Sequence, residues 1–271
     1  PRPPNPTMKT KLVITDLTRM QGTRICIAGY TREYECVRPV FWSSGLVERW
    51  LRDKGQVVIR PFAIVEFDLQ EHTPHPPHTE DWIIDEVYRV NYGILDIERQ
   101  KLFLTRIADK NVASIFGAPI EIGDGYYIEQ GMGTRSLGTV VPRKIKQVSY
   151  IKRDSGKWDF RIAFTDGAGQ SYNLGVTDLA FRYLLENARV RQGVAPEESA
   201  GQLTAFLQKA QVFLRIGLSR NWEKHPDRCF LQITGVHTFP DYLRGRCFAD
   251  LALTRQELLD VEEPQVTEEQ R

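Results

Sequence analysis

Short strand-like segments separated by turns are the feature that most constrains the fold of this chain. The first half holds five of them, at residues 9–17, 24–30, 34–40, 57–69 and 82–92. They are rich in β-branched and aromatic side chains, a turn centred on Gly22 separates the first two, and Pro61 favours an edge or a bulge in the fourth. Turns about every eight to twelve residues are typical of small barrels and sandwiches. The first half therefore predicts a mainly β domain.

The second half repeats this style. It holds five further strand-like segments, at residues 144–152, 157–165, 170–176, 212–218 and 229–236. Asp166-Gly167-Ala168-Gly169 is typical of a hairpin turn between the second and third of these. Residues 239–253 are expected to add a turn and another strand. Two domains of similar construction are the simplest interpretation.

Four helices are expected beside the strands. They cover residues 45–53, 95–107, 177–189 and 202–210. Either Thr177 or Asp178 is suited to cap the third helix, because a side-chain oxygen there accepts from a backbone N–H of the first turn. Residues 191–201 are polar and are expected to form a loop. The fold class is thus mainly β, of the α+β kind.

The glycine-rich segment 117–138 is the best candidate for a boundary between the two domains. It contains neither G-x-G-x-x-G nor G-K-[ST], which excludes the dinucleotide-binding and P-loop phosphate cradles. The expected organisation is a flexible leader at residues 1–8, a first domain at 9–125, a second domain at 126–255 and an acidic, disordered tail at 256–271.

A weak internal echo relates the two halves. Leu17-Thr18-Arg19 precedes an arginine-containing strand that reaches Gly29, and Leu218-Ser219-Arg220 precedes another that reaches Gly235. Either a true repeat or a chance similarity between two hairpins accounts for it.

Four segments carry a resemblance to a known family. They are PPHTEDW at 76–82, TDLAFRY at 177–183, LRIGLSR at 214–220 and CFLQITGVHTFPDYL at 229–243. With them the chain resembles the bacterial dual OB-containing domain proteins over roughly residues 8–253. The resemblance implies two OB-like small β-barrels with accessory helices, and work in a prokaryotic defence or nucleic-acid-processing system. It assigns no ligand and no catalytic residue.

The charge of the chain is unevenly distributed. The formal net charge of +1 suggests no affinity for a polyanion. However, residues 256–271 hold six acidic residues and one arginine, a net charge of −5, which leaves +6 for residues 1–255. The folded body is therefore moderately basic, and the total charge does not argue against a nucleic-acid partner.

Arginine and lysine alternate with aromatic residues on the strand-like segments of both halves. OB barrels bind single strands by stacking bases on exposed aromatic rings while cations contact the phosphates. The candidate nucleic-acid-binding residues are Arg19, Arg24, Tyr30, Arg32, Arg38, Lys144, Lys146, Lys152, Arg153, Trp158, Arg161, Arg220, Trp222 and Arg228. For any one of them a place in the core or on a solvated face is the alternative, since base-contacting residues are few. The set as a whole predicts a module that binds single-stranded DNA or RNA.

Other function classes have weaker support. The main alternative is a protein-interaction adaptor whose exposed strands and acidic tail contact a partner. A metal-dependent nuclease would need clustered carboxylates. The carboxylates considered for that role are dispersed along the chain: Asp16, Glu66, Asp68, Asp166 and Asp178. We therefore expect no catalytic residue and no cofactor.

A proline-rich loop contains three histidines, His72, His75 and His78, followed by two acidic residues. These are residue types that zinc uses as ligands. The prolines hold the loop extended, which directs the rings apart, and no Cys partner or HExxH motif is present. We expect a structural turn, with metal binding as the alternative.

The sequence also bears on the compartment. Four cysteines without a CxxC pair are too few for a disulfide framework. No apolar run approaches the roughly 18–20 residues that span a bilayer, and the first residues lack the apolar core of a signal peptide. A cytoplasmic protein without a membrane partner is expected.

Overall fold

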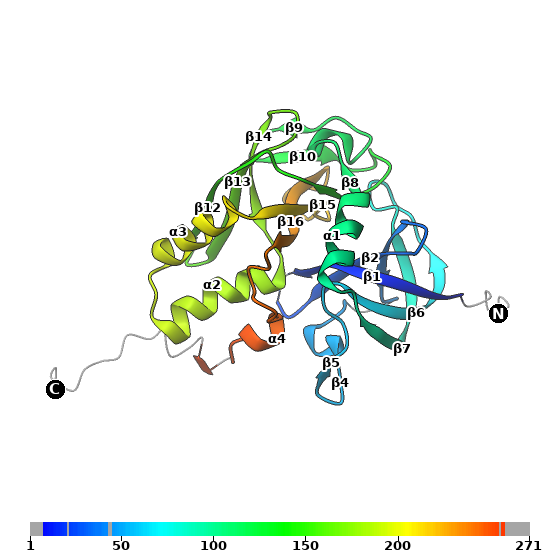
Figure 1. The fold of residues 1–271 in the computed structure, drawn as a ribbon. Helices are drawn as coiled ribbons and strands as arrows, with labels where there is room; N and C mark the ends of the chain where they lie inside the picture. The colour runs from blue at the N-terminus through cyan, green and yellow to red at the C-terminus, as the bar shows by residue number, and fades with distance from the viewer. Residues whose placement is uncertain (1–7, 21, 43–44, 255, 258–271) are drawn as a thin grey trace.

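The computed structural model describes residues 8–20, 22–42, 45–254 and 256–257, so nearly all of the expected leader and of the acidic tail lie outside the described residues. The fold is mainly β with short accessory helices, as the sequence predicts (Figure 1). No helix in the described part of the chain is long and apolar enough to cross a membrane.

Five strands of the first half form a closed barrel. They are β1 (Met8–Arg19), β2 (Ile25–Tyr30), β3 (Cys36–Val40), β6 (Ala63–His72) and β7 (Asp81–Ile94). Their order around the barrel is β1-β2-β3-β7-β6, and β6 pairs with β1 to close it. The β3–β7 pair is parallel, whereas the other neighbours are antiparallel. A five-stranded barrel of this Greek-key type is the OB fold.

The second half repeats this strand order without closing the barrel. Its strands are β12 (Lys144–Lys152), β13 (Trp158–Thr165), β14 (Ser171–Val176), β15 (Gln211–Leu218) and β16 (Arg228–Phe239). They lie in the order β12-β13-β14-β16-β15, and β14–β16 is again the parallel pair. The outer edge of β15 pairs with β11 (Leu137–Val140) instead of β12. By this order β1 corresponds to β12, so the internal echo, which aligns β1–β2 with β15–β16, compares strands that are not equivalent.

Helices cover the edge that stays open. Two of them connect β14 to β15: α2 (Leu179–Gln192) and α3 (Pro196–Leu207). Thr204 Oγ1 of α3 accepts a hydrogen bond from the backbone N–H of Val148 on β12 (2.8 Å). Gln208, just after α3, donates through Nε2 to the carbonyls of Ile145 and Lys146 (3.3 and 3.1 Å). Side chains therefore satisfy strand groups that a closing strand would otherwise pair.

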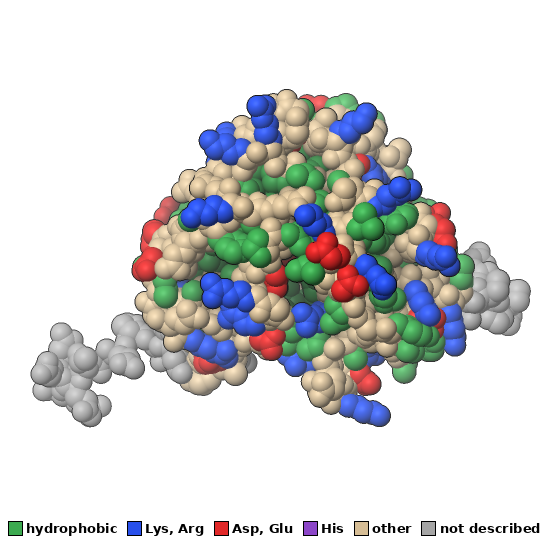
Figure 2. Space-filling model, in the orientation of Figure 1, with side chains coloured by type: hydrophobic (Ala, Val, Ile, Leu, Met, Phe, Trp, Pro, Cys, Tyr) green, Lys and Arg blue, Asp and Glu red, His purple; other side chains and the backbone are tan. Residues whose placement is uncertain are grey.

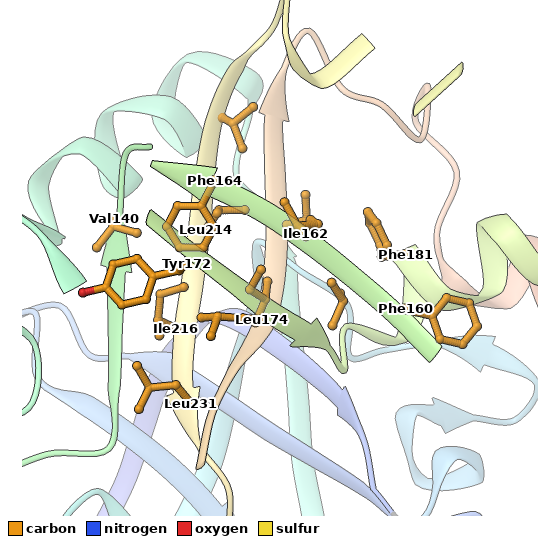
Figure 3. Packing of buried hydrophobic residues seen from close by; sticks show 14 of the residues in the cluster. Val140, Phe160, Ile162, Phe164, Tyr172, Leu174, Phe181, Leu214, Ile216 and Leu231 are labelled. Atoms are coloured by element: carbon orange, nitrogen blue, oxygen red, sulfur yellow. The ribbon is translucent and has the colours of Figure 1, made fainter. Parts of the chain in front are cut away.

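Each barrel has its own hydrophobic core. Alternation along β13 points Phe160, Ile162 and Phe164 into the second core (Figure 3). Helix α2 contributes to both cores, since Phe181 packs in the second and Tyr183 in the first. The two barrels thus share a helix as well as a junction.

A buried polar cluster lies at this junction. Arg215 of β15 is fully buried and donates to Asp16 Oδ2 (2.9 Å), the Tyr30 hydroxyl (2.7 Å) and Thr139 Oγ1 (2.7 Å). Asp16 also accepts from Thr234 Oγ1 of β16 (2.5 Å). Asp16 and Tyr30 belong to the first barrel, so the ion pair joins strands about two hundred residues apart in sequence.

Several local expectations are confirmed. Helix α1 (Ile97–Arg106) lies within the expected range, and Asp96 caps it. Asp178 caps α2, its side chain accepting from the N–H of Phe181. The hairpin turn at 166–169 connects β13 to β14.

Other local expectations were wrong. Residues 191–201 are not all loop, because α3 begins at Pro196, a residue favoured in the first turn of a helix. The helix expected at 45–53 is reduced to one 3-10 turn, Glu48–Leu51. The strand expected within 239–253 is replaced by α4 (Phe248–Leu251), where Cys247 and Asp250 cap each other.

The glycine-rich segment is folded onto the second barrel and is not a free linker. Short strands lie in and before it: β8 (Ala108–Asp109), β9 (Glu121–Ile122) and β10 (Tyr126–Glu129). Val112, Ile115 and Phe116 pack in the second core, although they precede the boundary expected at 125/126. The chain therefore joins the second barrel earlier than composition indicates.

A small hairpin, β4 (Arg52–Asp53) and β5 (Gln56–Val57), completes the strands.

Candidate nucleic-acid interface

Five of the fourteen candidate residues line one cavity between the barrels, which we call the inter-barrel cavity. Its volume is about 490 Å³. Arg19 ends β1, Arg24 precedes β2 and Arg38 lies on β3 of the first barrel, whereas Arg220 and Trp222 come from the β15–β16 loop of the second. Folding thus assembles cations and an aromatic ring from both halves around one hollow.

Arg38 and Arg220 of this cavity are held by carboxylates. Arg38 is buried, with Nε 2.6 Å from Asp81 Oδ1 and Nη2 3.9 Å from Glu80 Oε2. Arg220 pairs with the other oxygen of Asp81, so Asp81 links the two barrels. The Arg220 side chain is 42% exposed, which leaves donors free to reach a phosphate. Nη2 of Arg38 makes no hydrogen bond to any described residue.

Trp222 provides the ring surface of the site. Its side chain is 46% exposed, and its ring centroid lies 5.2 Å from Phe230 and 5.3 Å from His225. Phe230 in turn contacts Tyr127, on which the guanidinium of Arg228 lies (4.7 Å to the centroid). Packing against Phe230 and His225 therefore holds the ring, while nearly half of the residue remains exposed to contact a base.

A second hollow of about 290 Å³ lies over β13, β14 and β16, and we call it the β13–β14 shelf. Trp158 and Arg161 line it together with Phe230 and Gln232. Arg161, Gly175 and Gln232 form one row across the three strands, and a Cβ at Gly175 would meet no atom within 4 Å. The shelf is thus open above Gly175, on the second and third barrel strands that OB folds use for oligonucleotides.

A third hollow of about 930 Å³ adjoins both. It shares Arg19 with the inter-barrel cavity and Arg182 with the shelf, while Gln232 lines both the shelf and the inter-barrel cavity. Arg19 is held there by Glu48 (3.3 Å) and by the Tyr183 hydroxyl. We call these three adjoining hollows the track.

The remaining candidates are not part of the track. Tyr30 is buried with its hydroxyl bound by Arg215, so its ring offers no face to a base, a correction to its place in the candidate set. Six others line none of the three hollows: Arg32, Lys144, Lys146, Lys152, Arg153 and Arg228. Arg153 pairs with Asp159 (2.6 Å), and Lys146 bonds Ser171 Oγ (2.7 Å). Figure 2 shows Lys and Arg scattered among acidic side chains over one face, without a single basic patch.

Sequence reasoning missed several residues of the track. Asn173, Gly175 and Gln232 point outward from strands whose inward positions are apolar, so strand alternation could have singled them out. Arg182 lies on α2 with its guanidinium 4.7 Å from the Phe160 centroid. No strand pattern could have placed this helical residue on the shelf.

The loop forms a tight turn in which the backbones of His75 and His78 hydrogen-bond each other, but the three histidine side chains have different partners. The ring of His72 stacks on Trp82, and His75 Nδ1 bonds the Thr73 carbonyl. His78 is buried, 4.0 Å from Cys229 Sγ, and burial lowers its pKa to about 2. Within the described ranges, no three His, Cys, Asp or Glu residues gather as they would around a metal ion.

Three of the five dispersed carboxylates have the structural roles given below, whereas Oδ1 of Asp68 is buried without a hydrogen bond to any described residue. Asp16 binds Arg215, and Asp178 accepts from the N–H groups of Phe181 and Val236. Asp166 accepts from backbone N–H groups that include Val112. Their oxygens stabilise the junction, a helix start and a turn.

Among curated proteins, none matches this chain. One solved structure, a replication protein A heterotrimer bound to single-stranded DNA, aligns at 9% identity and a TM-score of 0.26, covering 96% of this chain and 70% of that one. The dual OB-containing domain family matches residues 10–236. With that match over most of its length and two barrels of one strand order, this chain belongs to the dual OB-containing domain family.

Proposed function

We propose that this protein binds single-stranded nucleic acid along the track. The observation that carries the proposal is the meeting of Arg220 and Trp222 from one barrel with Arg19 and Arg24 from the other around the inter-barrel cavity. Such a module would serve a nucleic-acid-processing or defence system, the setting that the family resemblance implies.

The chemistry of the track suits a single strand. The exposed part of the Trp222 ring stacks on a base, and Arg220 and Arg161 donate to phosphates, Arg161 through the N–H groups that its hydrogen bonds to Asn173 leave free. Base stacking accepts any base, so the affinity depends little on sequence. Duplex DNA lacks the unstacked bases that this arrangement uses.

Binding is tested by fluorescence anisotropy with labelled single-stranded DNA and RNA of about 30 nucleotides, since one OB fold covers at most about 16. We expect a Kd that rises with salt, because phosphate contacts release counterions. A duplex of the same length is expected to bind more weakly. Absence of binding at low salt, or a salt-independent Kd, would contradict the proposal.

The substitution Trp222→Ala tests the site itself. Loss of one stacked base costs about 1–3 kcal/mol, so we expect a Kd roughly 5- to 150-fold higher. The matched control is Trp42→Ala, which removes a 73% exposed tryptophan that lines none of the three hollows. Equal losses in both variants would assign the effect to something other than the track.

A further inference from the structure

A fourth cavity, of about 430 Å³, lies outside the track. It is formed where the first turns of α1 and α2 and the short helix α4 meet the end of the first barrel, and we call it the helix-junction cavity. Figure 2 shows a hollow at this place, with hydrophobic, basic and acidic side chains around it. Its size is within the roughly 300–1,000 Å³ of small-molecule sites.

The floor of this cavity is apolar. Phe62 and Ile94 come from the first barrel, Ala180 from α2 and Phe248 from α4, and the exposed Ile97 of α1 lies at the edge. An apolar ring or chain seated here would remove hydrophobic surface from water.

The wall of the cavity holds a buried hydroxyl without a partner. Tyr242 is buried, it lines the cavity, and its hydroxyl makes no hydrogen bond to any residue in the described part of the chain. A buried hydroxyl without a partner is costly, so such groups are rare in native proteins. Burial raises the pKa of Tyr242 well above its ordinary value, which keeps the hydroxyl protonated and able to donate.

The charged side chains favour an anion. Arg60, Arg244 and Arg246 line the cavity. Nε of Arg60 is buried and makes no hydrogen bond to a described residue. The two acidic residues of the wall are already engaged by backbone N–H groups: Asp178 by Phe181 and Val236, Asp241 by Leu243 and Gly245. Arg60 Nη2 donates to the Gly245 carbonyl (3.4 Å) and Arg246 Nε to the Leu243 carbonyl (3.1 Å), so it is the other N–H groups of these arginines that can serve a carboxylate or phosphate.

The backbone at the cavity is also unusual. Phe62 has φ +65° and Arg244 φ +54°, a region that non-glycine residues rarely occupy. Such strain is found at ligand clamps, where the surrounding structure holds it in place. Two strained residues therefore line the same hollow as the unpaired hydroxyl.

We propose that the helix-junction cavity binds a small organic anion, whose apolar ring or chain rests on Phe62 and Phe248 and whose anionic group accepts hydrogen bonds from Tyr242 and Arg60. Arg244 and Arg246 add positive charge at the same end. This site is separate from the track, and the two proposals stand or fall independently.

The first experiment uses a fluorescent probe with these properties, 1-anilinonaphthalene-8-sulfonate. We expect one saturable site per chain, and much weaker binding of N-phenyl-1-naphthylamine, which has the same rings without the sulfonate. Equal affinity for the two probes, or binding without saturation, would overturn the proposal.

The second experiment uses Tyr242→Phe, which removes the hydroxyl and keeps the ring. We expect the sulfonate probe to bind roughly tenfold more weakly, without loss of thermal stability, because an unpaired buried hydroxyl is removed. Tyr92→Phe, an exposed tyrosine outside the cavity, is the matched control. Affinity for single-stranded nucleic acid is expected to stay unchanged in both variants. Unchanged probe affinity in Tyr242→Phe would refute the site.

Loss of charge provides a further test. Arg60→Gln is expected to weaken the sulfonate probe about as much as Tyr242→Phe, whereas Arg153→Gln, on the far turn between β12 and β13, is expected to leave it unchanged. The neutral probe is the control for this variant, because its affinity reports whether the apolar floor is intact. Equal loss for both probes in Arg60→Gln would mean a damaged cavity and no anion site.

Discussion

At the scale of single residues, the junction between the barrels depends on ionisable groups without access to water. Arg215 keeps its charge because Asp16 pairs with its Nε and two hydroxyls accept from its Nη1, although its buried Nη2 makes no hydrogen bond to a described residue. His237 lies beside this pair, with Nε2 2.9 Å from the Thr15 carbonyl and its ring 4.8 Å from Phe62. Burial lowers the pKa of His237 to about 4. The junction is therefore built for a neutral histidine.

Acid is expected to act on this residue. In the unfolded chain a histidine gains its proton near pH 6.5, whereas folded His237 resists it down to about pH 4. The stability that His237 contributes is thus complete above pH 6.5 and falls by about 1.4 kcal/mol per pH unit between these values. Burial raises the pKa of Asp178 to about 6. Below that pH the folded protein binds a proton at Asp178 more readily than the unfolded chain does, so this residue adds stability on acidification and partly offsets the effect of His237.

Comparison of variants isolates the histidine. Urea unfolding at pH 7.5, 6 and about 5 measures the free energy of unfolding. In His237→Gln about one proton fewer is taken up on unfolding. The fall in the free energy of unfolding on acidification is therefore expected to be smaller by roughly 1.4 kcal/mol per pH unit. His75→Gln, an exposed histidine in the β6–β7 loop, should keep the slope of the unsubstituted protein. Identical slopes in all three proteins would contradict the argument.

At the scale of elements, the two barrels solve the edge problem differently. In the first, β6 pairs with β1 and closes the sheet. In the second, β15 pairs with β11, and α3 covers the free edge of β12 through Thr204 and Gln208. An uncovered strand edge is a template for aggregation, so these two side chains have a role beyond helix packing.

Removal of one of these contacts is expected to destabilise the second barrel. Thr204→Val keeps the shape of the side chain but leaves the N–H of Val148 without its acceptor. An unsatisfied buried donor costs about 1–3 kcal/mol, which urea unfolding would measure.

A matched threonine is present on α1. Thr105, like Thr204, donates from Oγ1 to the carbonyl four residues earlier, but it is exposed and bonds no strand. Thr105→Val is expected to change the free energy of unfolding by less than about 0.5 kcal/mol. If the two variants lost equal stability, the edge contact would have no special weight.

At the scale of the whole molecule, the loop between the fourth and fifth strands of each barrel contacts the other barrel. Glu80, the last residue of the β6–β7 loop, accepts from the Ser136 and Leu137 N–H groups of the second half. In the opposite direction, Arg220 of the β15–β16 loop forms an ion pair with Asp81 of the first barrel. The β6–β7 loop of the first barrel is thus used in contacts with the second barrel. The track therefore lies along the junction and along the surface of the second barrel. The relative position of the barrels fixes the geometry of the track.

The acidic tail gives a test at the same scale. Its net charge of −5 is attached next to Leu253, which lines the largest hollow of the track, and Glu257 already pairs with Arg191 (2.7 Å). We propose that the tail competes with nucleic acid, so deletion of residues 256–271 should strengthen binding severalfold at low salt and less at high salt.

Two comparisons separate charge from chain length in this test. Replacement of Glu262, Glu263, Glu268 and Glu269 by Gln keeps the length, and is expected to reproduce most of the gain. Fluorescence anisotropy measures both variants. Unchanged or weaker binding after the deletion would refute this role of the tail.

Most strands and the N-cap of α2 were open to prediction because they depend on neighbours in sequence. Alternation of apolar residues in 157–165 and the capping carboxylate of Asp178 are local signals. The errors lie where tertiary packing overrides local pattern. Residues 239–253 were expected to contain a strand, but they contain α4, whose apolar side chains pack in the first core. The glycine-rich segment shows the same effect, since it is folded onto the second barrel.

The candidate site divides in the same way. By itself the sequence determined that two mainly β units occur in one chain and that basic and aromatic residues are interleaved on their strands, because residue type and spacing are local properties. Only the tertiary structure decided that Tyr30 is buried against Arg215, that Arg19, Arg24 and Trp222 share a cavity, and that Asn173 and Gln232 belong beside them. Those relations join residues up to two hundred positions apart, and it is the packing of one barrel against the other that brings them together.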